Sequence, residues 1–74
     1  MNRERIQSIL DSGDADRIKA LIEPLEENKR GILYARFAEG LGWEQVGEKC
    51  YYSHKAAQYI ARNAIEELES LSIF

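Results

Sequence analysis

The C-terminal part of the chain carries the pattern that most restricts its fold, an apolar stripe with the period of an α-helix. The stripe continues for about four turns, long enough for an amphipathic helix. Its members recur at spacings of three and four residues and so share one helical face: Ala57, Ile60, Ala61, Ala64, Ile65, Leu68 and Leu71. Ser53 is a favourable N-cap. We therefore expect one long helix from Ser53 to about Leu71, with its apolar face covered by other elements.

Shorter segments with the same spacing precede this helix. They predict helices over residues 2–12, 15–23, 25–39 and 43–49. Pro24 interrupts the second stripe, because it lacks an N–H group and clashes with the preceding turn. We therefore place Pro24 in the first turn of the third helix.

Capping and glycine residues mark the expected helix ends and contacts. Asn2 caps the first helix, and Asp14 or Asp16 caps the second. Gly13 ends the first helix and Gly40 is the expected left-handed C-cap of the third. Two glycines inside helices suggest the close approach of another helix, namely Gly31 and Gly47.

The pattern predicts little or no sheet. Val, Ile and Thr are sparse between residues 30 and 70 and do not alternate with polar residues. The sequence therefore predicts an all-α fold, a small helical bundle of four or five helices. A length of 74 residues fits a single domain over residues 1–74.

Charge and residue content narrow the function. We expect no membrane span, because every apolar run is too short, and no secretory signal, so the chain is read as cytoplasmic. The single cysteine, Cys50, and the single histidine, His54, are too few for a metal site. No pair of carboxylates suits acid/base chemistry, so we expect no enzyme, no catalytic residues and no cofactor.

Residues 41–65 show the plan of a helix-turn-helix, two short helices joined by a tight turn with a capped second helix. Trp43 is expected to pack the first of these helices onto residues 25–39. Tyr51 stands where many such turns have glycine. A left-handed conformation there costs a bulky residue about 1 kcal/mol or more, so we expect a remodelled turn. Tyr51 or Tyr52 is expected in the core.

Three stretches in this region carry a family resemblance: Arg36-Phe37-x-Glu39-Gly40-Leu41-x-Trp43-Glu44, Val46-x-x-Lys49-Cys50-Tyr51-Tyr52-Ser53 and Ala64-Ile65-x-x-Leu68. The region resembles region 4 of bacterial sigma factors, and more closely the sigma-region-4-like domains of small phage regulators of the ArpU and RinA type. The resemblance covers about residues 30–69. It implies a sigma-region-4-like unit over residues 25–71, preceded by an N-terminal helical extension over residues 1–24.

The resemblance also implies a DNA contact, because the second helix of the unit enters the major groove and reads base edges. Carried over by position, the implied nucleic-acid-binding residues are Ser53, His54, Lys55, Gln58, Tyr59 and Arg62. The first hypothesis is therefore a DNA-binding transcriptional regulator of phage or mobile-element origin, with double-stranded DNA as its partner.

The second hypothesis is a protein-binding module on the same fold, which inhibits or redirects a host protein such as RNA polymerase, a regulator or a defence nuclease. The formal net charge of −3 is unfavourable for binding phosphates. Alanines are expected on the reading face at Ala56 and Ala61, and the chain ends on the apolar Ile73 and Phe74. A third question is assembly, since the narrow stripe in residues 2–12 either completes the core or pairs two chains as a homodimer.

Overall fold

Five α-helices and one π-helical segment make up the fold in the computed structural model, which describes residues 2–71. They are α1 (Arg3–Asp11), α2 (Ala15–Ile22), α3 (Glu27–Leu33), η1 (Tyr34–Ala38), α4 (Trp43–Cys50) and α5 (His54–Leu71). No strand occurs among these residues. The predicted all-α class is therefore confirmed. The expected role of Ile73 and Phe74 lies outside the described residues.

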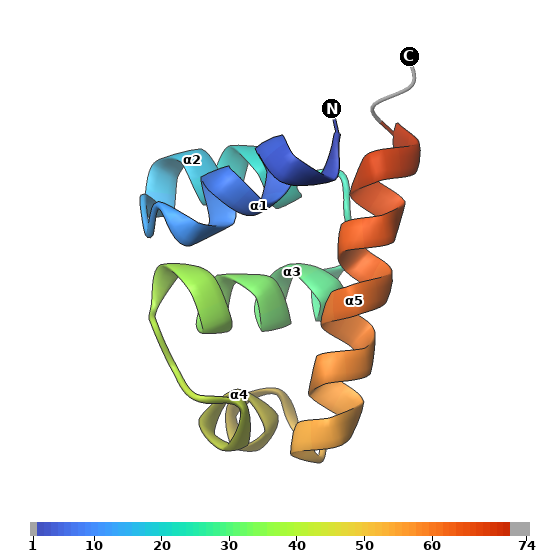
Figure 1. Ribbon diagram of the computed structural model, residues 1–74. Helices are drawn as coiled ribbons and strands as arrows, with labels where there is room; N and C mark the ends of the chain where they lie inside the picture. Colours follow the sequence, from blue (N-terminus) through green and yellow to red (C-terminus); the bar gives the residue numbers. More distant parts are fainter. Residues whose placement is uncertain (1, 72–74) are drawn as a thin grey trace.

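The long helix α5 links the two ends of the molecule (Figure 1). α1 and α2 lie beside each other at one end, α3 and η1 cross the middle, and α4 lies at the other end. α5 runs along one side and contacts α1, α3 and α4. The apolar stripe of α5 therefore packs against most of the other helices of the bundle.

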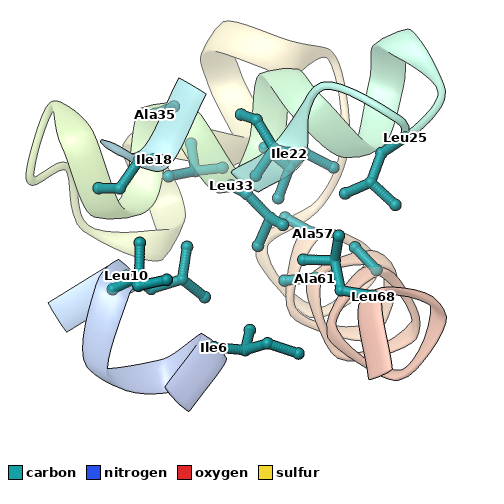
Figure 2. Close-up of a cluster of buried hydrophobic side chains, with 14 residues drawn as sticks. Ile6, Leu10, Ile18, Ile22, Leu25, Leu33, Ala35, Ala57, Ala61 and Leu68 are labelled. Carbon is teal, nitrogen blue, oxygen red and sulfur yellow. The ribbon is translucent and has the colours of Figure 1, made fainter. Parts of the chain in front are cut away.

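A single cluster of apolar side chains fills the space between the helices (Figure 2). Its fully buried large members are Ile6, Leu10, Ile18, Leu25, Ile32, Leu33 and Val46. α1 contributes to this cluster as fully as the later helices do. The narrow stripe of residues 2–12 therefore completes the core of the chain itself.

Small side chains let α5 approach its neighbours closely. Ala57, Ala61 and Ala64 are all buried on the inner face of α5. The expectation that Ala61 lies on the outward face is wrong, because it follows Ala57 by four residues and so shares its face. Ala56 is half-buried, so neither alanine offers an open contact surface.

Several predicted helix ends are confirmed. The Asn2 Oδ1 atom accepts the backbone N–H of Arg5 at 2.8 Å. Asp14 Oδ1 accepts two backbone N–H groups at the start of α2, at 3.1 and 3.3 Å. Gly13 and Gly40 both have a φ of 71°, the left-handed conformation expected at a helix end.

The predicted place of Pro24 is wrong. It lies in the turn between α2 and α3, and α3 begins only at Glu27. The Leu25 N–H donates to the Ile22 carbonyl at 3.0 Å, and Leu25 is 2% exposed. The turn therefore directs Leu25 into the core, and this burial outweighs the preference of proline for a first helical turn.

The predicted helix over residues 25–39 is shorter and ends in a π-helical turn. The Glu39 N–H donates to the Tyr34 carbonyl at 3.0 Å, one residue further back than in an α-helix. Arg36 in this turn donates from Nη1 to the Leu41 carbonyl at 2.9 Å and lies 4.9 Å from the centre of the Trp43 ring. These contacts attach the start of α4 to η1, as expected for Trp43.

Candidate nucleic-acid interface

Gly47 leaves room for the turn between α4 and α5 to lie close against α4. A Cβ atom on Gly47 would lie 2.4 Å from the Tyr52 carbonyl oxygen, too close for any real contact. The Tyr52 N–H donates to the Gly47 carbonyl at 2.8 Å. The tight approach predicted at Gly47 is therefore present, but its neighbour is the backbone of the turn. At Gly31 another helix is also the neighbour but lies less close, since a Cβ there would meet only the Cys50 Sγ of α4, at an ordinary distance of 3.9 Å.

Residues 51–53 form the turn between the two helices. Tyr51 has φ 65° and ψ 40°, the left-handed conformation, and its side chain is 94% exposed. The expected remodelling is therefore absent. Tyr52 is half-buried against the core, so it is the one tyrosine of the pair that packs inward. The left-handed conformation of Tyr51 places the Tyr52 N–H against the Gly47 carbonyl, and this hydrogen bond offsets the strain.

We predict that Tyr51→Gly stabilises the protein by about 1 kcal/mol, because glycine adopts a left-handed conformation without a Cβ penalty. Urea denaturation followed by circular dichroism measures the change. Tyr51→Ala is the matched control, since it removes the same ring but keeps the Cβ atom. Equal stabilities of the two variants would contradict the prediction.

The six predicted contact residues lie at or near the start of α5. The Ser53 Oγ accepts the backbone N–H of Ala56 at 3.2 Å, which confirms its role as N-cap. All six side chains belong to exposed residues: Ser53, His54, Lys55, Gln58, Tyr59 and Arg62. Spacings of three and four residues from Lys55 through Gln58 to Arg62 place these three on one side of the helix.

Two positive charges lie on this side of α5. Within residues 2–71, no ion pair joins Lys55 or Arg62 to a carboxylate. Lys49, by contrast, is paired with Glu39. Free cations can exchange their counterions for phosphates without first breaking an ion pair. The cationic stretch ends at Glu66, one turn beyond Arg62.

A groove of about 390 Å³ extends this surface toward α1. Its walls come from four elements, α1, η1, α4 and α5, and include Arg3, Gln7, Phe37, Trp43, Gln58 and Arg62. Sequence reasoning missed Arg3 and Gln7, because no local pattern relates residue 3 to residue 62. The stripe on α1 signals only that this helix packs somewhere.

Metal ligands and a reactive thiol are the two kinds of chemical group that the described residues can be searched for. Residues 2–71 contain no group of three or more His, Cys, Asp or Glu side chains that could hold a metal ion. Burial raises the pKa of the Cys50 thiol, which disfavours the nucleophilic thiolate. No helix in this part of the chain is long and apolar enough to cross a membrane.

Comparison with known proteins gives one partial likeness. A ribonuclease 3 from Spiroplasma citri is 35% identical over an alignment of 75 positions, which covers 95% of this chain and 29% of the ribonuclease. The chain thus spans less than a third of that protein. No protein-family model matches the chain. No solved structure matches it either.

Proposed function

We propose that this chain is a DNA-binding transcriptional regulator of the helix-turn-helix type, of phage or mobile-element origin. In this proposal α4 and α5 are the two helices of the motif and α5 enters the major groove. The observation that carries the proposal is the exposed cationic side of α5 directly after a tight turn, where Lys55 and Arg62 form no ion pair with a carboxylate of residues 2–71. The resemblance to sigma factor region 4 assigns contact residues to this same helix.

Each side chain on this face has a chemical partner on DNA. Lys55 and Arg62 bind phosphate oxygens or the acceptor edge of guanine. Gln58 donates and accepts hydrogen bonds at the adenine edge. The backbone N–H groups at the start of α5, next to Ser53, bind a phosphate. The face thus combines non-specific attraction with a small number of base contacts.

The partial likeness to a ribonuclease supports a nucleic-acid partner, because a ribonuclease acts on nucleic acid. It does not extend to cleavage, since the chain spans only 29% of that protein. Double-stranded DNA is the partner that the cationic side of α5 and the sigma-factor resemblance favour together.

Replacing both free cations on α5 tests the proposal. We predict that Lys55→Gln/Arg62→Gln lowers the affinity for duplex DNA roughly ten- to thirtyfold at about 0.15 M salt, because two phosphate contacts are lost. Fluorescence anisotropy with a labelled random-sequence duplex measures this affinity. The matched control is Arg17→Gln/Lys19→Gln, which makes the same charge change on α2, at the end of the molecule away from α4.

Comparison of the two double variants shows whether DNA affinity depends on contacts at α5 or only on the net charge of the protein. Equal losses in both would mean that net charge alone governs binding, and would overturn the role of α5. No measurable binding of the unaltered chain at about 0.05 M salt, where phosphate attraction is strong, would overturn the DNA proposal itself.

A second candidate function is a protein-binding module on the same fold. The observation that favours it is the exposure of two aromatic side chains, Tyr51 at 94% and Tyr59 at 64%. Tyrosine and arginine often dominate protein interfaces, and Tyr59 lies on α5 between Lys55 and Arg62. Capture of a host protein that is lost in Tyr59→Ala, combined with absent DNA binding, would favour this candidate.

A further inference from the structure

The helical extension α1 delivers an arginine to the groove beside α5. Arg3 stands at the first position of α1 and lines the same groove as Gln58 and Arg62. Burial of Ile6 and Leu10 fixes α1 against the core. The position of Arg3 is therefore set by the packing of α1.

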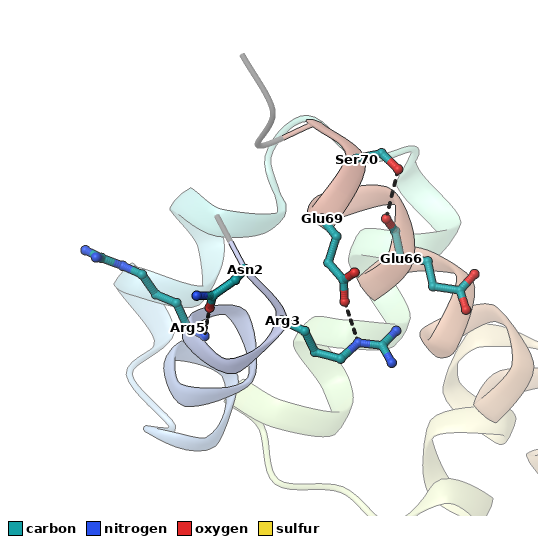
Figure 3. A network of polar contacts seen from close by, with 6 residues as sticks. All are labelled: Asn2, Arg3, Arg5, Glu66, Glu69 and Ser70. Atoms are coloured by element: carbon teal, nitrogen blue, oxygen red, sulfur yellow. Dashed lines mark hydrogen bonds and ion pairs between the residues drawn. The ribbon is translucent and has the colours of Figure 1, made fainter.

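An ion pair orients the side chain of Arg3. Its Nε atom contacts the Glu69 Oε1 at the far end of α5, and Figure 3 shows the side chain extending from α1 toward that helix. An arginine has five N–H donors, of which the Nε contact uses one. The Arg3 side chain is 55% exposed. More than half of this side chain is thus open to solvent beside the candidate DNA face.

We propose that Arg3 binds the DNA backbone at a phosphate next to the one held by Arg62, so that α1 forms part of the DNA interface. This inference rests on the proposed function of α5. A guanidinium is the preferred partner of a phosphate, because its planar fork matches two phosphate oxygens. Glu69 pre-orients the guanidinium, which reduces the side-chain entropy lost on binding.

Arg5 provides a matched comparison on the same helix. It is two residues from Arg3 and carries the same charge, but its side chain extends away from α5 in Figure 3. Its backbone N–H donates to the Asn2 Oδ1 atom, and a change of the Arg5 side chain does not remove this hydrogen bond. The two arginines should therefore contribute almost equally to long-range attraction of DNA. Only Arg3 should add a direct phosphate contact.

The salt dependence of DNA binding tests the inference. For a labelled random-sequence duplex, the slope of log affinity against log salt changes by about 0.9 for each phosphate contact that is lost. We expect Arg3→Gln to make the slope shallower by about 0.9, which is a change of roughly threefold between about 50 and 200 mM salt. Arg5→Gln is expected to leave the slope unchanged, and Arg3→Lys to retain the slope of the unaltered chain.

The outcomes separate this inference from the function on which it rests. If the unaltered chain binds DNA and the slopes of Arg3→Gln and Arg5→Gln agree, the contact at Arg3 is overturned and the role of α5 stands. A slope in Arg3→Lys as shallow as that in Arg3→Gln would also overturn it, because the slope counts the phosphate charges neutralised and lysine keeps the positive charge. Thermal unfolding followed by circular dichroism is the control for folding. Equal unfolding temperatures of all three variants exclude a loss of folded protein as the cause of a changed slope.

Discussion

Gly47→Ala is expected to destabilise the protein by about 1–3 kcal/mol, although the same change inside a helix normally stabilises. The added Cβ atom would lie 2.4 Å from the Tyr52 carbonyl oxygen and 3.3 Å from the His54 nitrogen. Both are backbone atoms, so the clash is relieved only by moving the turn away from α4. Urea denaturation monitored by circular dichroism gives the free energy of unfolding.

Gly31→Ala is the matched control for this prediction. Gly31 also lies inside a helix, but its added Cβ would meet only the Cys50 Sγ at 3.9 Å, an ordinary contact. We expect a gain of about 0.5–1 kcal/mol, because alanine loses less backbone entropy on folding than glycine. A stabilised Gly47→Ala would mean that the turn does not rest on α4, and the close approach at this residue would be rejected.

The second large effect is expected at Leu10. Leu10 is 1% exposed and belongs to the common core, so Leu10→Ala is expected to cost about 2–5 kcal/mol through lost burial and a residual cavity. A domain of this size has a total stability of only several kcal/mol. The variant is therefore expected to be partly unfolded at room temperature, as measured by its helical circular dichroism signal and its urea midpoint.

Ser8→Ala, an exposed change on the same helix, controls for an effect on helix propensity. It is expected to shift the stability by less than about 0.5 kcal/mol. A cost below about 1 kcal/mol for Leu10→Ala would indicate that α1 contributes little to the core. The stripe on α1 would then be free to pair two chains, and sedimentation at several protein concentrations would reveal that assembly.

Local patterns predicted most of the helices and several of their ends. The apolar period from Ala57 to Leu68 predicted α5, because a helical repeat is a property of neighbouring residues. Asn2 and Asp14 predicted caps, since a cap depends on hydrogen bonds within one turn. Gly40 predicted a left-handed helix end for the same local reason.

The structure departs from the local preferences at three places. Pro24 lies in a turn and not in the first turn of a helix, because this turn places Leu25 in the core. Tyr51 adopted a left-handed conformation because the neighbouring Tyr52 N–H bonds to Gly47. Residues 34–38 widened into a π-helical turn, for which the sequence offered no signal.

The apolar stripe of α5 and the polar residues on its outer side were determined by the sequence alone, because both follow from the helical period. Which partners cover that stripe was decided only by the tertiary structure. The meeting of Arg3 with Arg62 in one groove arises from the burial of α1 against the core. Such a juxtaposition depends on the sum of many apolar contacts between distant segments, and no pattern of neighbouring residues encodes it.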